Sequence, residues 1–164
     1  MSVSKSSETA QGAGFEPTRL RQFTVFMDNR VGRLQSLVRS FEEEADTIVA
    51  ISIEESADSA LVRLICTNPD KGRYILSQHN YPFSESELLA VELPPGNRQP
   101  LIAICTALLG AEINIHYAYA LLSHPRGGPA LALYVDDPTL AAQVLIRKGF
   151  TLIGESDLGA QPTG

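Results

Sequence analysis

The sequence predicts an α+β protein made of two βαββαβ units, each an antiparallel sheet with two helices on one face. Three observations predict it: an internal repeat, apolar residues that alternate as in strands, and apolar residues spaced as in amphipathic helices. The composition agrees, because 44% of the 164 residues are hydrophobic and 20% are charged, as in ordinary globular proteins.

The internal repeat is clearest around a dipeptide that ends in proline. Asn68-Pro69 recurs as Asp137-Pro138, and at the same spacing one alternating apolar triplet falls on another: Val62, Leu64 and Cys66 on Leu131, Leu133 and Val135. Further upstream, the sequence separation between equivalent residues of the two repeats becomes slightly shorter. The changes fall in two expected loops, 94–97 and 123–128, where insertions are tolerated.

Each unit is expected to run strand, helix, strand, strand, helix, strand. In the first unit the strands lie near 21–27, 47–55, 60–67 and 83–87, and the helices near 33–44 and 69–79. In the second the strands lie near 88–93, 112–122, 129–136 and 150–156, and the helices near 100–110 and 138–148. This order is that of ferredoxin-like domains. We therefore expect units at 19–87 and 88–158, with disordered tails at 1–18 and 159–164.

The first helix of each unit carries four apolar residues at i, i+3, i+4 and i+7, which form one buried stripe: Leu34, Leu37, Val38 and Phe41, then Leu101, Ile104, Cys105 and Leu108. Asp137-Pro138 is a typical helix start, and Gly149 a typical helix stop. Cys66 and Cys105 both occupy apolar positions, so we expect two buried, unpaired thiols.

One face of the predicted sheet in the first unit must be buried by another part of the protein. If Ile48 and Ala50 point toward the helices, then Val49, Ile51 and Ile53 point away from them, and an isolated unit would leave these side chains in water. Because large exposed apolar patches usually mark interfaces, we expect a homodimer or stacking of the two sheets within the chain.

Charge and motifs exclude several classes of function. The net charge of −6 and the lack of a basic stripe argue against a nucleic-acid partner. No stretch approaches the length of a membrane span, and the first residues do not resemble a signal peptide, so we expect a cytoplasmic protein without a membrane partner. Cys/His spacings typical of zinc, phosphate-binding loops and catalytic signatures are not found, so we expect no metal, no cofactor and no catalytic residue.

Two segments resemble the signature of ACT domains, which are small ligand-binding regulatory domains. Residues 28–34, Asp-Asn-Arg-Val-Gly-Arg-Leu, resemble the family's loop of Asn, a basic residue, Pro, Gly and a helix-starting Leu. Residues 111–115, Ala-Glu-Ile-Asn-Ile, resemble its Gly-Ile-Asn-Ile strand. The resemblance covers about residues 20–158 and, in a doubled frame, is similar to stand-alone tandem ACT proteins.

The resemblance implies a small ligand, commonly an amino acid, bound where two ACT units meet. The implied contacts are Asp28, Asn29, Val31, Gly32, Arg33 and Leu34 from the first unit, with Asn114 and His116 from the second. The helix N-terminus beside Gly32 can also attract a carboxylate on physical grounds. Val31 replaces the family's Pro, Thr47 replaces the strand Asn in the first unit, and loop 94–100 has lost the pattern, which favours one complete site built from both units.

Plainer roles remain open for these residues. Asp28 and Asn29 also fit a turn or helix cap, Asn114 an exposed strand residue, and His116 a surface or interface histidine. We expect a non-catalytic sensor of an amino acid or similar metabolite, acting as a homodimer. The alternatives are a regulatory subunit that docks on a biosynthetic enzyme and, less favoured, a small ferredoxin-like enzyme such as an acyl-phosphate hydrolase.

Overall fold

The computed structural model describes residues 18–159 and has the expected α+β order of elements. Almost all of the two expected tails lies outside these residues. The first half contains β1 (Leu20–Asp28), α1 (Arg33–Glu43), β2 (Ile48–Glu55), β3 (Ser59–Cys66) and α2 (Pro69–Gln78). β4 (Phe83–Glu92) follows, and then α3 (Pro100–Gly110), β5 (Ile115–Ala120), β6 (Ala130–Val135), α4 (Pro138–Arg147) and α5 (Glu155–Leu158).

The six strands form one sheet in the order β2-β3-β1-β4-β6-β5, with antiparallel neighbours throughout. β4 is shared between the halves: residues 83–88 pair with β1, and residues 89–92 pair with β6. The two strands expected at 83–87 and 88–93 are therefore one continuous strand. The expected boundary between residues 87 and 88 lies inside it.

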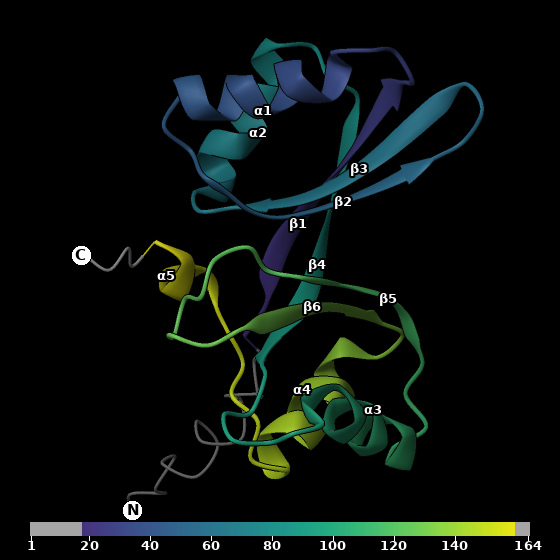
Figure 1. The fold of residues 1–164 in the computed structure, drawn as a ribbon, viewed down its shortest axis with the longest axis vertical. Coiled ribbons are helices and arrows are strands. Elements are labelled where there is room, and N and C mark those ends of the chain that lie inside the picture. Colours follow the sequence, from purple (N-terminus) through teal and green to yellow (C-terminus); the bar gives the residue numbers. More distant parts are fainter. Residues whose placement is uncertain (1–17, 160–164) are drawn as a thin grey trace, which may run out of the picture.

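The helices cover opposite ends of this sheet, α1 and α2 at one end and α3 and α4 at the other (Figure 1). One core lies beneath α1 and α2 around Phe23, Leu37 and Phe41, and a second lies beneath α3 and α4. A third core joins the two sheet halves through their helix-free faces. It contains Leu20, Val49, Ala50, Ile65, Leu88, Ala90, Tyr119, Leu121, Ala130, Ala132, Ile153 and Leu158. Stacking of the two sheets within the chain is therefore confirmed.

The two edge strands meet and close the sheet around the third core. Ala50 forms an isolated antiparallel bridge with Leu121, and the backbone N–H of Leu122 donates to the carbonyl of Val49 at 2.6 Å. β2 is irregular here, because its register with β3 shifts between Ile48 and Ala50. Such a bulge turns successive side chains to the same face.

This bulge corrects the expected alternation of β2. Val49 and Ala50 both enter the core between the sheets, whereas Ile48 and Ile51 pack against the core beneath α1. Val49 is covered as predicted, but the prediction that Ile51 points the same way is wrong. An extra residue in one strand reverses the faces of all the residues that follow it.

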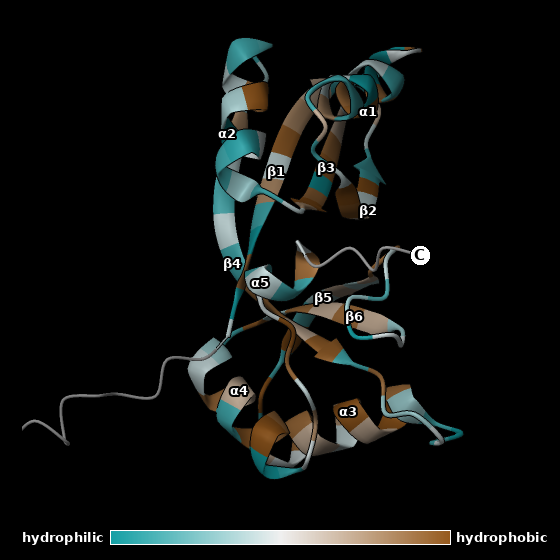
Figure 2. Ribbon diagram, turned by 90° about the vertical axis from the view of Figure 1, so that its left-hand side faces the viewer, coloured by the Kyte–Doolittle hydropathy of each residue, from teal (hydrophilic) through white to brown (hydrophobic). Residues whose placement is uncertain are grey.

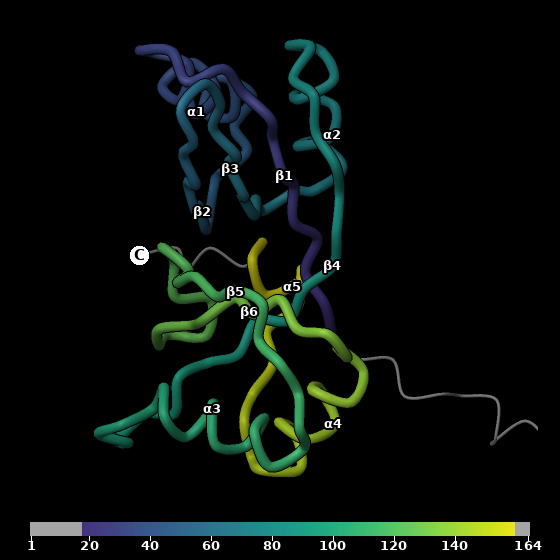
Figure 3. The backbone as a smooth tube through the Cα atoms, turned by 90° about the vertical axis from the view of Figure 1, so that its right-hand side faces the viewer, coloured from purple at the N-terminus to yellow at the C-terminus, as the bar shows by residue number. Residues whose placement is uncertain are grey.

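The expected strand at 150–156 is reduced to a short pairing. The N–H of Glu92 donates to the carbonyl of Thr151 at 2.9 Å, and the N–H of Ile153 donates to that of Ala90 at 2.8 Å. The chain then turns into α5, where the Asp157 carboxylate accepts from the N–H of Gly154 at 2.8 Å. The C-terminal turn lies beside the junction of the two halves (Figure 3).

The expected buried stripe of α3 is partly wrong. Ile104, Ala107 and Leu108 are buried, whereas Leu101 and Cys105 are exposed. Of the two cysteines, only Cys66 is buried as expected.

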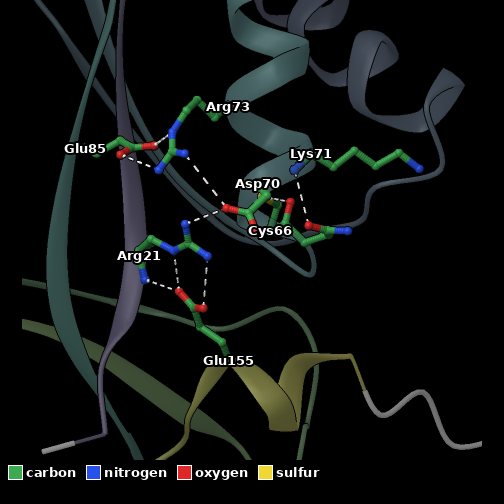
Figure 4. A network of polar contacts seen from close by, with 8 residues as sticks. Arg21, Cys66, Asp70, Lys71, Arg73, Glu85 and Glu155 are labelled. Carbon is green, nitrogen blue, oxygen red and sulfur yellow. Dashed lines mark hydrogen bonds and ion pairs between the residues drawn. The ribbon is translucent and has the colours of Figure 1, made fainter. Parts of the chain in front are cut away.

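Charged side chains also join the halves. Arg21 on β1 donates from Nε to Glu155 of α5 at 2.9 Å and from a terminal nitrogen to Asp70 of α2 at 2.9 Å (Figure 4). Asp70 also lies 3.9 Å from Arg73, which binds Glu85 through two hydrogen bonds. Arg21 lowers the pKa of the Asp70 carboxyl chiefly through this hydrogen bond. Each carboxylate of this network already faces a guanidinium, so we assign it to holding α2 and α5 against β1.

Candidate ligand-binding site

The turn between β1 and α1 is shaped by Gly32. Its φ of 87° is left-handed, a conformation that glycine adopts without a steric penalty. Gly32 is also the residue that caps α1, and it offers no side chain to the helix N-terminus. Among the described residues, the backbone N–H groups of Val31, Gly32, Leu34 and Gln35 donate to no protein acceptor. The turn therefore presents free donors at the positive end of the α1 dipole.

Three of these residues, Val31, Gly32 and Leu34, border a cavity of about 270 Å³ at the end of β1. Seven consecutive residues of the turn line it: Asp28, Asn29, Arg30, Val31, Gly32, Arg33 and Leu34. The opposite wall comes from Met27 and from the hairpin of β2 and β3, through Ile53, Glu55, Ala60 and Val62. The structure therefore brings together all six site residues that the sequence predicted in the first unit.

Charges of both signs and apolar groups share this cavity. Arg30 and Arg33 are cationic, and Asp28 and Glu55 are carboxylates. The Asp28 carboxylate lies 3.8 Å from Arg30 Nε, and both side chains are largely exposed. Arg33 lies over the ring of Tyr81, with 5.8 Å between the guanidinium carbon and the ring centroid. The arrangement can pair an anionic group, a cationic group and an apolar group of one small molecule.

The two site residues predicted from the second unit lie elsewhere. Asn114 is exposed just before β5, and its backbone N–H donates to the Asp136 carboxylate at 3.2 Å. His116 is exposed and contacts Tyr134, with 5.7 Å between ring centroids. The turn between β1 and α1 lies at the end of the molecule that carries α1, and β5 begins toward the other end (Figure 1). Neither residue lines the cavity, so one chain does not bring Asn114 to Asn29.

The degenerate counterparts of these residues have local structural roles. The Asn97 side-chain oxygen accepts from the N–H of Gln99 at 2.8 Å, just before α3. The N–H of Thr47 donates to the hydroxyl of Thr67 at 3.3 Å, and both residues lie near the start of the β2–β3 pairing. Neither residue lines the cavity at the β1–α1 turn.

Sequence reasoning missed the hairpin wall of the cavity. Ile53 is half exposed and Glu55 is the last residue of β2. The pairing of Met27 with Ala60 and of Val25 with Val62 brings the β3 residues to the end of β1. Once β3 is placed beside β1, the residues after the β2–β3 turn are the ones that reach the β1–α1 turn. This order of strands was the signal that could have found them.

Two further features of residues 18–159 concern metal binding and membrane insertion. No group of three or more His, Cys, Asp and Glu side chains there is arranged to hold a metal ion. No helix in that part of the chain combines the length and the apolar character needed to cross a membrane.

A family model and several solved structures match this chain. The family model for an ACT domain pair matches residues 18–161. A crystal structure of a protein from Bacteroides thetaiotaomicron superposes with a TM-score of 0.79 at 21% identity, covering 88% of this chain and 99% of that one. The ligand-free regulatory subunit of aspartate kinase from Thermus thermophilus gives a TM-score of 0.54 at 5% identity, covering 80% and 93%. A search of curated proteins found no match.

Proposed function

Because this chain belongs to the ACT domain family, as a pair of such domains, we propose that it is a non-catalytic sensor of an amino acid or a similar small metabolite. The family is one of regulatory domains, and the expected ferredoxin-like pair is the fold observed. The ligand site we propose is the cavity between the β1–α1 turn and the β2–β3 hairpin.

The observation that carries this proposal is the set of free amide donors at the N-terminus of α1. A carboxylate there would accept from the free N–H groups of Val31, Gly32 and Leu34, and the helix dipole and the Arg33 guanidinium add to the attraction. Hydrogen bonds to a charged group each contribute about 1.5–3 kcal/mol.

The remaining walls support an amino acid in particular. Asp28 and Glu55 provide carboxylates for an ammonium group, and Ile53 and Val62 provide an apolar surface for a side chain. The cavity of about 270 Å³ suits a small ligand. Asn29 adds an amide that can donate to the carboxylate or accept from the ammonium group, so we propose it as the orienting residue.

A thermal-shift screen of the twenty amino acids, followed by calorimetry, tests this proposal. A ligand at about 100 times its dissociation constant should raise the free energy of unfolding by about 2.7 kcal/mol. Asn29→Ala should weaken binding about ten- to a hundredfold, the loss of one charged hydrogen bond. Asn97→Ala, at the degenerate loop, is the matched control and should bind like wild type. Failure of every amino acid to shift the transition would refute an amino acid as the ligand.

The role of the second unit is tested by Asn114→Ala and His116→Ala. For a site formed within one chain, both variants should keep wild-type affinity. A tenfold loss in Asn114→Ala would mean that a second chain supplies this residue to the cavity, as the resemblance to the family implies.

A further inference from the structure

α3 exposes an uncharged apolar face that nothing in the described chain covers. The exposed fractions of Leu101, Ile102 and Leu109 are 53%, 57% and 76%, and Cys105 is exposed between them. The residues of α3 carry no Lys, Arg, Asp or Glu, and Figure 2 colours much of this helix as hydrophobic, in contrast to α1 and α2. A face of this kind usually marks an interaction surface.

The face is nearly symmetric about its middle residue. Cys105 stands halfway between Pro100 and Gly110, the two ends of the helix. Leu101 and Leu109 lie four residues before and after it, which places all three side chains on one stripe. Two such helices crossing antiparallel at Cys105 would set Leu101 of each chain against Leu109 of the other.

The charges flanking the helix follow the same symmetry. Arg98 lies two residues before the helix and Glu112 two residues after it, and both are exposed. Within residues 18–159, neither takes part in an ion pair. In the antiparallel arrangement Arg98 of one chain approaches Glu112 of the other, at both ends of the contact. The contact is thus complementary in charge.

We propose that α3 is the interface of a two-fold homodimer, in which it packs antiparallel on the α3 of a second copy and the two Cys105 residues meet at the axis. A two-fold contact uses the same patch on both chains, so the patch must complement itself. This one does so through an uncharged stripe with opposite charges at its two ends. Two copies with a net charge of −6 repel each other elsewhere, which favours contact through a face without acidic groups.

The rest of the fold supports this choice of surface. The sheet faces that an isolated unit would expose are already packed on each other inside one chain, in the core that contains Val49, Leu88 and Ala132. They are therefore not available to a second copy. The proposal does not depend on the ligand site, because α3 and the β1–α1 turn lie at opposite ends of the molecule (Figure 1).

The first test is the mass of the protein in solution, measured by sedimentation in the micromolar range. Wild type should be a dimer. Leu109→Glu and Leu101→Glu should each be monomers, because a dimer of either variant would bury two carboxylates in the contact. Both residues are exposed within the chain, so the monomers should keep the wild-type circular dichroism spectrum. Tyr74→Glu, at a 56% exposed apolar residue on α2, is the matched control and should remain a dimer.

The second test uses Cys105 to report the register. Mild oxidation by copper phenanthroline and oxygen should join two Cys105 thiols in a disulfide, with two electrons passing to the oxidant and two protons released. Cys66 is buried and should not take part. Cys105→Ser should abolish the cross-link. The double variant Cys105→Ser with Tyr74→Cys has its exposed thiol on α2 instead of α3, and it should not form the cross-link.

Each result supports or overturns the proposal. A wild-type monomer throughout the micromolar range, or a dimer that survives Leu109→Glu, would overturn the interface. A dimer that is lost in Leu109→Glu but gives no Cys105 cross-link would overturn the antiparallel pairing centred on this residue.

Discussion

Replacement of Gln22 by leucine should destabilise the contact between the two sheet halves. Gln22 is fully buried on β1, and its amide nitrogen donates to the hydroxyl of Ser86 at 3.1 Å and to that of Tyr117 at 2.7 Å. Its carbonyl oxygen accepts from the hydroxyl of Tyr119 at 2.5 Å. Tyr117 and Tyr119 belong to β5, so this one side chain links the first unit to the last strand pair of the second.

The size of the loss in the free energy of unfolding depends on the Tyr119 hydroxyl. Tyr119 is buried, and burial raises the pKa of its phenol, which therefore stays protonated and needs an acceptor. Gln22→Leu removes that acceptor, and a buried unsatisfied polar group costs about 1–3 kcal/mol. Tyr117 is half buried, so its hydroxyl can bind water instead of Gln22. Loss of the hydrogen bond between Gln22 and Tyr117 therefore adds less to the destabilisation. We expect a loss of about 1–3 kcal/mol, or about 2–4 °C of melting temperature for each kcal/mol.

A double-mutant cycle measured by urea unfolding tests this reasoning. Tyr119→Phe alone leaves the buried Gln22 carbonyl without its hydrogen-bond donor, and it should lower the free energy of unfolding by a similar amount. The double variant removes both partners and should cost clearly less than the sum of the two single variants, since paired removal can be nearly neutral. Additivity within about 0.5 kcal/mol would mean that the two side chains act independently and would refute the linking role of Gln22.

Two further predictions concern the core beneath α2. Gly72→Ala would place a Cβ 2.7 Å from the Cys66 sulfur, so we expect urea unfolding to show a loss of about 1–3 kcal/mol from overpacking. Gly110→Ala, with open space around its Cβ, should be neutral or stabilising by up to about 1 kcal/mol, and an equal loss in both variants would contradict the packing argument. Burial raises the pKa of the Cys66 thiol above its ordinary value of 9.0, so the thiol stays protonated in the folded state and ionises on unfolding. Its stabilising effect is complete below that value and is lost as the pH rises above it. Above about pH 9, wild type should therefore lose about 1.4 kcal/mol per pH unit more than Cys66→Ala in the same assay. Parallel pH profiles would show that the thiol is solvated in the folded state.

The fold was predictable because two kinds of periodicity recur in the same order in both halves. The strand triplet that ends in Cys66 and the one that ends in Val135 both enter a core, and both precede a helix that begins with proline. Asn68 and Asp137 cap these helices through side-chain oxygens, as such residues commonly do. Local rules alone suffice for these elements, since each depends on residues close in the sequence.

The features that sequence reasoning missed depend on contacts between distant residues. The bulge at Val49 frees a carbonyl that Leu122 uses, and no local pattern encodes that partner. In α3 almost every residue is apolar, so periodicity could not separate the buried Ile104 from the exposed Cys105. The last expected strand is short because only Thr151 and Ile153 reach β4 before the chain turns into α5.

The candidate site shows the same division between local and distant information. The β1–α1 turn was identified as a candidate because its glycine and its position before a helix are local features. Its hairpin wall was not found, because Ile53 and Ala60 arrive through the pairing of β2 and β3 with β1. Asn114 was placed in the site by resemblance alone, and the geometry of one chain gives it no contact there.

The shared strand β4 explains why the two loops that precede α1 and α3 could diverge. One half of this strand pairs with β1 and the other with β6, so the two units extend in opposite directions from it. The β1–α1 turn therefore lies at one end of the molecule and loop 94–100 at the other (Figure 1). A small ligand held at Gly32 cannot also touch Asn97, so a change in the second loop leaves the first one intact. The loss of the signature in one repeat and its survival in the other follow from this separation, without requiring that both loops build a single site.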